Sequence, residues 1–400
     1  MDDVLIVGAG PAGAVAAVVL ARAGARVRLI DRSRFPRHKL CGDTLNPGTV
    51  AILGRLGLRS ALEGDALSLE GMIVSGPRGV VVEGRYGAGL RGLSLSRSLM
   101  DQVLVDEALR AGAVFEPGIA VRDALIDDKQ GVPRVAGVTA AVGGVLCRWR
   151  APVVIAADGR RSALASSLGL LTQTVSPRRW AIGAYFEDAH SSKLGEMHIR
   201  KGRYIGVAPL PGQVSNVCVV RPAGANDAHW AAPEALLRRE LDQEPMLRDR
   251  FAGARVVRPP IVLGPLACDI TGHAIDGLLL AGDAAGFIDP MTGDGLRFAV
   301  RGGELAAAAA LEALATGWNG LHARLARERR REFSAKWRFN RAVRAAVERP
   351  SIVEAAAAGA QLAPGLMRRM IAFAGDCGLA REESGSSHPS AVSQHHIHVK

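Results

Sequence analysis

Glycines near the start of the chain have the spacing of a dinucleotide-binding turn. Gly8, Gly10 and Gly13 follow the apolar run Val4–Val7 and precede a segment rich in alanine and valine. In such a turn the first glycine permits the tight bend, the second lets the backbone approach a pyrophosphate, and the third lets helix and strand pack closely. The positive end of the following helix then faces the phosphates. We therefore predict a nucleotide site formed by Gly8, Gly10, Pro11, Ala12 and Gly13.

Three acidic residues stand at the ends of apolar runs that are typical of buried strands. Asp31 ends the run that begins at Val27, Asp158 ends a second run, and Asp283 ends a third. A carboxylate at the end of a parallel strand accepts hydrogen bonds from the hydroxyls of a ribose. Glycines next to Asp158 and Asp283 leave space for such a ligand. Taken separately, the Asp158 and Asp283 motifs could each be an ordinary turn. In this order after the glycine turn, they predict carboxylates that bind the hydroxyls of a ligand.

The elements that position these residues begin as a strand–helix–strand unit. A helix from about Pro11 to Ala23 separates two strands without polar alternation, which predicts a parallel sheet buried on both faces. Further helices are expected at about 46–56, 96–111, 233–250, 303–315 and 321–349, and 351–374 is also helical in character. Between them, residues 175–265 are rich in short strand-like runs. The sequence thus predicts an α/β fold with a second, mixed-sheet layer.

In this order, the three motifs resemble those of FAD-dependent oxidoreductases with a glutathione-reductase-type Rossmann domain. That superfamily includes aromatic hydroxylases, flavin halogenases and geranylgeranyl reductases. The segment from Phe35 to Pro47, with Cys41-Gly42-Asp43 inside it, looks like the corresponding segment of the geranylgeranyl reductase branch. The resemblance implies FAD as cofactor, bound by Gly8, Gly10, Pro11, Ala12, Gly13, Asp31, Arg32, Cys41, Gly42, Arg97, Val121, Asp158, Gly282, Asp283, Gly293, Gly295 and Leu296.

The resemblance also implies a role for each part of this set. The adenosine part of FAD is expected at the glycine turn and Asp31, and the ribityl chain at Asp283. The residues from Gly293 to Leu296 are expected beneath the flavin ring, where a helix N-terminus stabilises the negative charge of the reduced ring. Arg97 is expected to contact the phosphates or the flavin edge. The alternative is a solvated arginine at the start of a helix.

The branch that the chain resembles implies a reductase for a hydrophobic small molecule. Reduced flavin would transfer a hydride from N5 to a C=C bond of an isoprenoid-like or polyketide-like substrate, with Cys41 as proton donor or redox modulator. The alternative for Cys41 is a small buried hydrophobe. One alternative function is a monooxygenase that hydroxylates or epoxidises a hydrophobic or aromatic substrate through a flavin hydroperoxide. A third is a non-catalytic prenyl-lipid-binding protein on the same fold.

The predicted substrate pocket includes Tyr204, Gly206 and Pro209. The branch carries a signature resembling Tyr-x-Trp-x-Phe-Pro, whereas Gly206 and Ala208 here replace both large aromatics. The loss of side-chain volume favours a bulkier or polycyclic apolar substrate. Electrons would come from NAD(P)H, with Arg160 and Arg161 meeting its phosphates, or from another external donor such as a ferredoxin. The alternative is that both arginines are solvated loop charges.

Composition narrows the remaining classes of function. Hydrophobic residues make up 48 % of the 400 residues, enough for a sizeable core, while aromatics reach only 4 %, which disfavours stacking platforms for nucleic acid. Five scattered cysteines without a CxxC pair favour a reducing cytoplasm and predict no disulfide framework or metal site. No apolar run approaches the length of a membrane span. The expected location is cytoplasmic, with peripheral contact to the inner face of a membrane as a further hypothesis.

That hypothesis comes from the distribution of the net charge of +11. Residues 321–349 contain ten basic and three acidic residues, a net +7, with apolar side chains on one half of the helical wheel. This pattern predicts either a C-terminal helix docked on the cofactor domain or an interfacial helix on an anionic membrane.

The predicted domains are discontinuous. Residues 1–66, 96–174 and 266–320 are assigned to the FAD-binding domain and 67–95 with 175–265 to the β-rich substrate domain. Residues 321–380 are assigned to a C-terminal helical region and 381–400 to a disordered tail.

Overall fold

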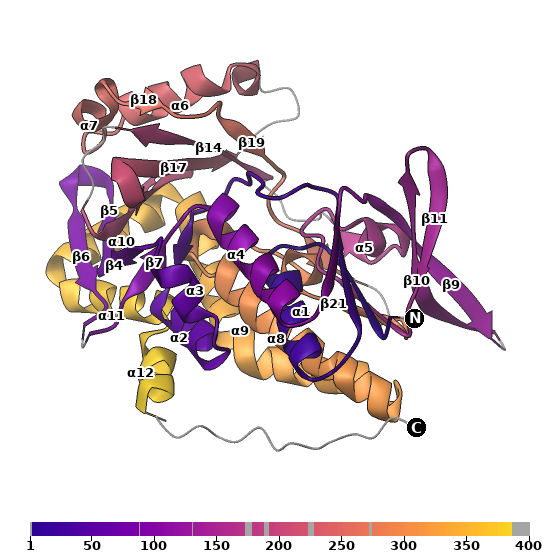
Figure 1. Cartoon of the computed structure of the whole chain (residues 1–400). Coiled ribbons are helices and arrows are strands. Elements are labelled where there is room, and N and C mark those ends of the chain that lie inside the picture. Colours follow the sequence, from indigo (N-terminus) through magenta and orange to yellow (C-terminus); the bar gives the residue numbers. More distant parts are fainter. Residues whose placement is uncertain are drawn as a thin grey trace.

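A five-stranded parallel sheet lies at the centre of the nucleotide-binding part (Figure 1). The computed structural model describes residues 2–87, 89–129, 131–172, 178–187, 192–222, 228–271 and 274–385. The strands in spatial order are β21 (Leu278–Leu280), β12 (Val153–Ala156), β1 (Val4–Val7), β2 (Val27–Asp31) and β8 (Val114–Pro117). Every strand pair in this sheet is parallel. The prediction of a buried parallel sheet is therefore confirmed.

The two faces of this sheet are covered by different layers. Val4 and Ile6 pack with the helices α1 (Pro11–Arg22), α4 (Arg97–Arg110) and α8 (Gly295–Thr316). Leu5 and Val7 point to the opposite face, as alternation along a strand requires. They pack with an antiparallel sheet of β9 (Val121–Lys129), β10 (Val132–Val142) and β11 (Val145–Arg150), and with α5 (Ala163–Ser167). The strand β1 is fully buried for this reason.

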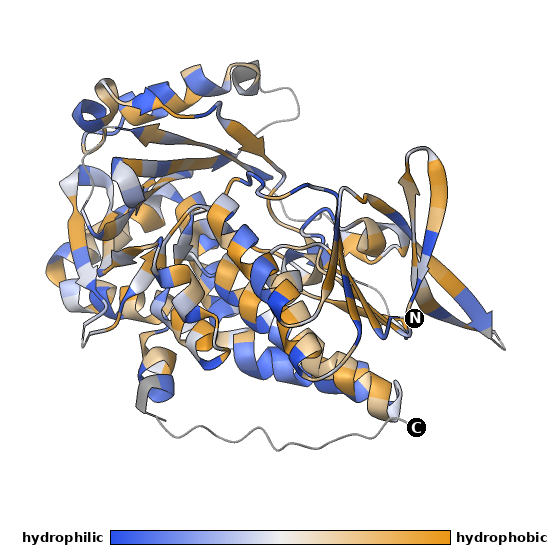
Figure 2. Cartoon of the chain, in the orientation of Figure 1, coloured by the Kyte–Doolittle hydropathy of each residue, from blue (hydrophilic) through white to orange (hydrophobic). Residues whose placement is uncertain are grey.

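A second, mainly antiparallel sheet forms the other half of the molecule. Its strands are β18 (Arg255–Val256), β14 (Arg179–Glu187), β17 (Val214–Pro222), β16 (Arg203–Leu210), β15 (Leu194–Arg200), β5 (Gly71–Ser75) and β6 (Val81–Arg85), with β19 (Ile261–Leu263) also paired to β14. Helices α6 (Pro233–Asp242) and α7 (Arg248–Ala252) cover one face. Figure 2 shows the apolar residues of β14 and β17 in the layer below these helices.

A small sheet connects the two halves. It has the strand order β3 (Thr44–Leu45), β7 (Gly92–Ser94) and β4 (Leu67–Leu69). Helices α2 (Pro47–Arg55) and α3 (Arg59–Glu63) lie between β3 and β4 in the chain. The segment 67–95 is therefore shared: β5 and β6 extend the large sheet, whereas β4 and β7 pair with β3 beside the cofactor-binding segments.

Four helices follow in the described part of the chain: α9 (Leu321–Glu348), α10 (Pro350–Leu362), α11 (Pro364–Ala374) and α12 (Cys377–Gly385). In α9 the apolar face is buried in the protein through Leu321, Leu325, Phe333 and Val347. The α9 helix thus docks on the cofactor-binding part, the first of the two alternatives that its amphipathic pattern allowed.

Three predicted elements differ from those observed. The helix predicted at 303–315 begins earlier, at Gly295, and includes Gly303, which packs closely against Ala12 of α1. The helix predicted at 233–250 is split into α6 and α7. The predicted tail from Arg381 is helical as far as Gly385, where α12 ends; residues 386–400 lie outside the described part of the chain. Within the described ranges, no helix has the length and apolarity needed to cross a membrane.

Candidate functional site

The glycine turn between β1 and α1 adopts a conformation that only glycine supports. Gly8 has φ +101°, and a Cβ at this position would lie 2.4 Å from the carbonyl oxygen of Ala157. A Cβ on Gly13 would lie 1.9 Å from the carbonyl oxygen of Gly8. Helix α1 begins at Pro11 with no side-chain cap, so N–H groups of its first turn remain available to an anion. The loop has the shape and polarity of a phosphate site.

Asp31 links the end of β2 to this turn. One carboxylate oxygen accepts a hydrogen bond from the N–H of Ala9 at 2.8 Å, and the other accepts one from Ser33 at 2.8 Å. Each oxygen retains a further lone pair for a ribose hydroxyl. Arg32 follows in an exposed position. Val121 begins β9 and packs in the apolar cluster beneath the parallel sheet.

A group of cationic side chains lies beside the glycine turn. Arg97 is buried and forms a paired contact with Asp101, with nitrogen–oxygen distances of 2.8 and 2.9 Å. Arg37 contacts the same carboxylate at 3.0 Å, and its buried Nε has no hydrogen-bond partner among the described residues. A Cβ on Gly10 would lie 3.4 Å from the Arg37 guanidinium and 3.9 Å from that of Arg97. The predicted interaction of Arg97 with phosphate thus has a geometric basis.

Two more cations face this region from neighbouring loops. A Cβ on Gly159 would lie 3.9 Å from Nζ of Lys39, and burial, followed by the charge of Arg97, lowers the pKa of Lys39. Within the part of the chain that the structure describes, the buried Nη1 of Arg160 has no partner, and burial lowers the pKa of Arg160. Orphaned buried donors in a positively charged pocket fit a ligand that brings negative charge, as a dinucleotide pyrophosphate does. The residues present therefore fit FAD.

Asp158 presents a free acceptor to the same region. One of its oxygens, Oδ2, accepts a hydrogen bond from the N–H of Ala163 at 2.7 Å at the start of α5. The other, Oδ1, is buried and has no partner in the described ranges. Burial raises the pKa of this carboxyl group. A ligand hydroxyl is the kind of donor that would satisfy Oδ1. The sequence predicts Asp158 as a site residue because it follows the end of an apolar strand.

The far end of the predicted FAD site is formed by the start of α8. Gly282 and Asp283 lie in a short helical turn after β21, and Gly282 has φ +59°. Gly293, with φ +70°, precedes the first turn of α8, in which Gly295 and the buried Leu296 lie. A helix N-terminus at this place provides N–H groups for the flavin edge that the motifs predict.

Cys41 and Gly42 lie where the cofactor-binding loop meets the large sheet. The side chain of Cys41 is half-buried beside the Arg97 guanidinium. Its carbonyl oxygen accepts a hydrogen bond from Nδ2 of Asn216 on β17 at 2.5 Å. Burial opposes the positive charge of Arg97, but Asp101 and then Cys41 offset this effect, so the pKa of Arg97 is raised.

Asp43, two residues after Cys41, is not among the site residues that the sequence predicts. It is 1 % exposed, has φ +54°, and accepts hydrogen bonds from Tyr185 Oη at 2.7 Å, Asn216 Nδ2 at 2.7 Å and the Arg97 N–H at 3.2 Å. Burial raises its pKa to about 7, against these three donors. The acidic residue in Cys41-Gly42-Asp43 was visible in the sequence; its burial was not.

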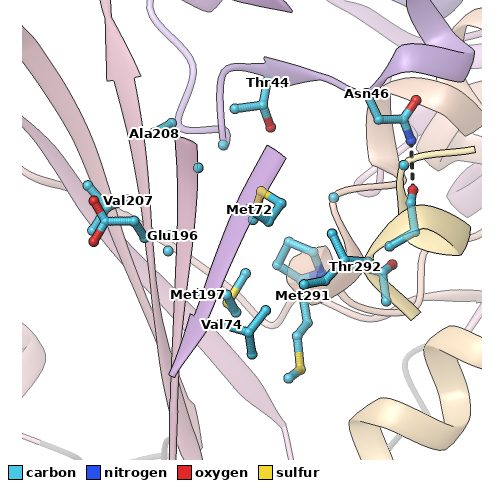
Figure 3. Close-up of a pocket in the computed structure, with 18 of the residues that line it drawn as sticks. Thr44, Asn46, Met72, Val74, Glu196, Met197, Val207, Ala208, Met291 and Thr292 are labelled. Atoms are coloured by element: carbon cyan, nitrogen blue, oxygen red, sulfur yellow. Dashed lines mark hydrogen bonds between the residues drawn. The ribbon is translucent and has the colours of Figure 1, made fainter. Parts of the chain in front are cut away.

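An apolar cavity lies between the large sheet and the C-terminal helices, with an interior volume of about 190 Å³. Its wall contains apolar side chains of β5, β15, the turn before α8, α9 and α11, namely Met72, Val74, Met197, Ile199, Met291, Phe339, Val343, Met367, Met370 and Ile371. Figure 3 shows Met72, Val74, Met197 and Met291 converging, whereas Glu196 and Val207 point to the other side of their strands. The cavity meets the predicted flavin position at Gly42 and Gly293.

The structure places the three predicted pocket residues differently. Gly206 belongs to the wall, as does Ala208. Tyr204 lies on the same strand face, but its ring is buried and its hydroxyl donates to Asp289 at 2.6 Å, so it is not part of the wall. Pro209 is also outside the wall, because successive residues of β16 face opposite sides.

Comparison with known protein families gives one match that spans most of the chain. The family described as "FAD binding domain" matches residues 1–339. Among curated proteins, digeranylgeranylglycerophospholipid reductase 1 of Methanopyrus kandleri is 32 % identical over 327 residues, covering 78 % of this chain and 81 % of the relative. Menaquinone reductase of Mycobacterium tuberculosis is 32 % identical over 321 residues, covering 76 % and 75 %.

One relative, from a eukaryote, extends well beyond the region that it shares with this chain. Conditioned medium factor receptor 1 of Dictyostelium discoideum is 28 % identical over 341 residues, which is 78 % of this chain and 63 % of that protein.

Solved structures agree on the fold. A geranylgeranyl bacteriochlorophyll reductase-like protein of Thermoplasma acidophilum has a TM-score of 0.73 at 20 % identity, covering 97 % of both chains. A myxobacterial chondrochloren halogenase has a TM-score of 0.80 at 22 % identity, covering 96 % and 97 %.

Proposed function

Because the chain belongs to the FAD-binding domain family and is an FAD-dependent oxidoreductase, we propose that it reduces a C=C bond of an isoprenoid-like or polyketide-like substrate. The observation that carries this proposal is the apolar cavity, which opens to the predicted flavin position at Gly42 and Gly293. Two relatives are named as reductases of a digeranylgeranyl glycerophospholipid and of menaquinone, which supports an apolar substrate.

The protein would contribute binding, orientation and the exclusion of water. When bound and reduced, FAD supplies a hydride donor. The methionines and aliphatic residues of the cavity position an apolar substrate and keep water away from the reacting carbon atoms. Arg97, fixed by Asp101, contributes positive charge near the cofactor. Cys41 is the proposed proton donor, and Asp43 holds a proton near neutral pH two residues away.

Gly206 and Ala208 support a wide substrate over a narrow prenyl chain. A Cβ on Gly206 would find Met197 Cε at 3.8 Å and no closer atom, so the wall has space at this position. Electrons are proposed to come from NAD(P)H or another external donor. Of the two arginines suggested for NAD(P)H, Arg161 already donates to the carbonyl of Gly264, whereas Arg160 keeps a buried donor without a partner.

Anaerobic single-turnover measurements test this proposal. The flavin is photoreduced under argon and mixed with a panel of prenyl lipids and polyketides. We expect at least one substrate to reoxidise the flavin without oxygen and to yield a product two hydrogen atoms heavier.

The two alternatives predict different results in the same experiment. A monooxygenase would leave the flavin reduced under argon and would give a product with one added oxygen atom in air. A prenyl-lipid-binding protein without catalysis would retain the lipid but show no substrate-dependent reoxidation in either gas. Each of these results would overturn the reductase proposal.

A further inference from the structure

Two leucines at the turn between α10 and α11 are exposed. Leu362 is 89 % exposed and Leu366 is 63 % exposed, and only Ala363, Pro364 and Gly365 separate them. A single exposed leucine is ordinary on a protein surface. Two exposed leucines at one turn, next to exposed alanines of α10, form an apolar protrusion. Covering this protrusion with another apolar phase lowers the free energy.

The charged residues along this stretch of the chain are all basic. From Ala355 through Gly375 the chain has no acidic residue, and its charged side chains are Arg368 and Arg369, both exposed. Arg368 contacts the carbonyl oxygen of Glu83 on β6 through Nε. Apolar side chains flanked by arginines complement a lipid surface with negative headgroups, where the apolar part enters the acyl boundary and the cations remain at headgroup level.

The same helix forms a wall of the substrate cavity. Met367, Met370 and Ile371 of α11 line the cavity from the inside, within one or two turns of Leu366 on the outside. α11 also packs against β6, at the edge of the large sheet where β5 contributes Met72 and Val74 to the wall. Helix α11 therefore carries part of the exposed turn at its start and lines the apolar cavity with its inner face.

The apolar face of the basic helix α9 is buried and is not available to a membrane. Its apolar residues Leu321, Leu325, Phe333 and Val347 are buried in the protein. Its exposed side chains include the arginines Arg327, Arg330, Arg331, Arg338 and Arg341. The apolar side chains that an interfacial helix at 321–349 would insert into a membrane are therefore buried in the protein. The α10–α11 turn exposes apolar side chains instead.

We propose that residues 361–369, the α10–α11 turn, insert into an anionic lipid bilayer and that an apolar substrate enters the cavity along α11. The entry of substrate rests on the proposed function, whereas the insertion of the turn is measurable without any turnover.

Co-sedimentation of the FAD-loaded protein with vesicles tests the insertion. The vesicles contain phosphatidylcholine alone or phosphatidylcholine with phosphatidylglycerol. We expect the wild type to sediment with the anionic vesicles and to be released by salt. Replacing both Leu362 and Leu366 by serine is expected to weaken partitioning roughly tenfold or more. Replacing both Arg368 and Arg369 by glutamine is expected to weaken binding to anionic vesicles about fivefold per arginine.

A remote apolar pair provides the matched control. Val145 and Leu146, at the start of β11, are 64 % and 60 % exposed. Strand β11 lies across the molecule from α10 and α11 (Figure 1). The variant with serine at both positions is expected to bind vesicles as the wild type does. Flavin absorbance and far-UV circular dichroism confirm that each variant is folded and loaded.

Two results would overturn the inference. One is a wild type that sediments with neither type of vesicle. The other is equal loss of binding in the remote pair and in the leucine pair at the turn. Anaerobic flavin reoxidation by a detergent-dispersed substrate is measured in parallel, because it tests the proposed function alone. Reoxidation without vesicle binding refutes the insertion only, and vesicle binding without reoxidation refutes the reductase only.

Discussion

Cys41 lies beside Arg97, its carbonyl oxygen accepts a hydrogen bond from Asn216, and the next residue, Gly42, lines the apolar cavity. If its thiol delivers the proton, Cys41→Ser should retain FAD and lose about a hundredfold in turnover, a typical contribution of a positioned acid. Stopped-flow reoxidation with substrate measures this loss. Cys147→Ser, on the remote strand β11, is the control and should keep wild-type turnover. Full turnover in Cys41→Ser would remove the thiol from the mechanism.

Asp43 gives the folded protein a pH dependence of stability. Burial raises its pKa from 3.8 to about 7, so the folded chain binds more protons than the unfolded chain between these values. The stability that the protonated group contributes is complete below the unfolded pKa and is lost as the pH rises through about 7. The slope within this window is ~1.4 kcal/mol per pH unit.

The variant Asp43→Asn isolates this effect. Loss of the carboxyl group should flatten the dependence of unfolding free energy on pH, whatever constant cost the substitution carries. Urea unfolding at about pH 5 and about pH 8 compares the two proteins. Equal slopes in wild type and variant would show that Asp43 titrates normally in the folded chain.

The contact between α1 and α8 depends on glycine. A Cβ on Gly303 would lie 2.2 Å from the carbonyl oxygen of Ala12, in the first turn of the helix that follows the phosphate loop. Gly303→Ala is expected to destabilise the fold by ~1–3 kcal/mol and to weaken FAD binding, because α1 must move. Thermal unfolding and FAD titration measure the two effects.

Helix α10 offers the matched substitution. Gly359 is helical, and a Cβ at this position would meet no atom within 4 Å, so Gly359→Ala should stabilise by ~0.5–1 kcal/mol through helix propensity alone. Similar effects of the two substitutions would contradict the packing explanation.

Strand β16 sets the width of the cavity. A Cβ on Gly206 would lie 3.8 Å from Met197 Cε, an ordinary contact, and Gly206 lines the cavity, so the ring of Gly206→Phe would reduce the space within it. We expect FAD binding to be unchanged and KM to rise for polycyclic substrates more than for short prenyl chains. Steady-state kinetics on both substrate classes measure the ratio. An equal change for both classes would show that the ring does not occupy substrate space.

At the scale of the whole molecule, Lys336 connects the C-terminal helices to the start of α8. Its buried ammonium group donates to Asp294 at 3.0 Å and to the carbonyls of Phe373 and Ala374 at 2.6 and 2.9 Å. Lys336→Met leaves the carboxylate of Asp294 buried without its cation, which should cost ~3–5 kcal/mol. Denaturant unfolding measures the loss. Arg338→Gln, an exposed change on the same helix, should stay within ~0.5 kcal/mol; a comparable loss there would contradict this role.

The sequence by itself determined the βαβ start, the glycine turn and the strand-end carboxylates. These features are local: the three glycines and the apolar runs act through neighbouring residues, so spacing alone predicts their conformation. The same reasoning predicted the helical character of 321–349, whereas Gly206 was predicted as a pocket residue from the resemblance to the reductase signature.

Only the tertiary structure decided the environment of these residues. Asp43 is buried by Tyr185 and Asn216, which are 142 and 173 residues away in the chain. Tyr204 shares a strand face with Gly206 but is covered by Asp289 from another segment. The α11 wall of the cavity, and the buried apolar face of α9, likewise depend on contacts between distant segments. Burial and partners come from such contacts, and burial is what changes the pKa of a carboxyl group or the availability of an apolar face.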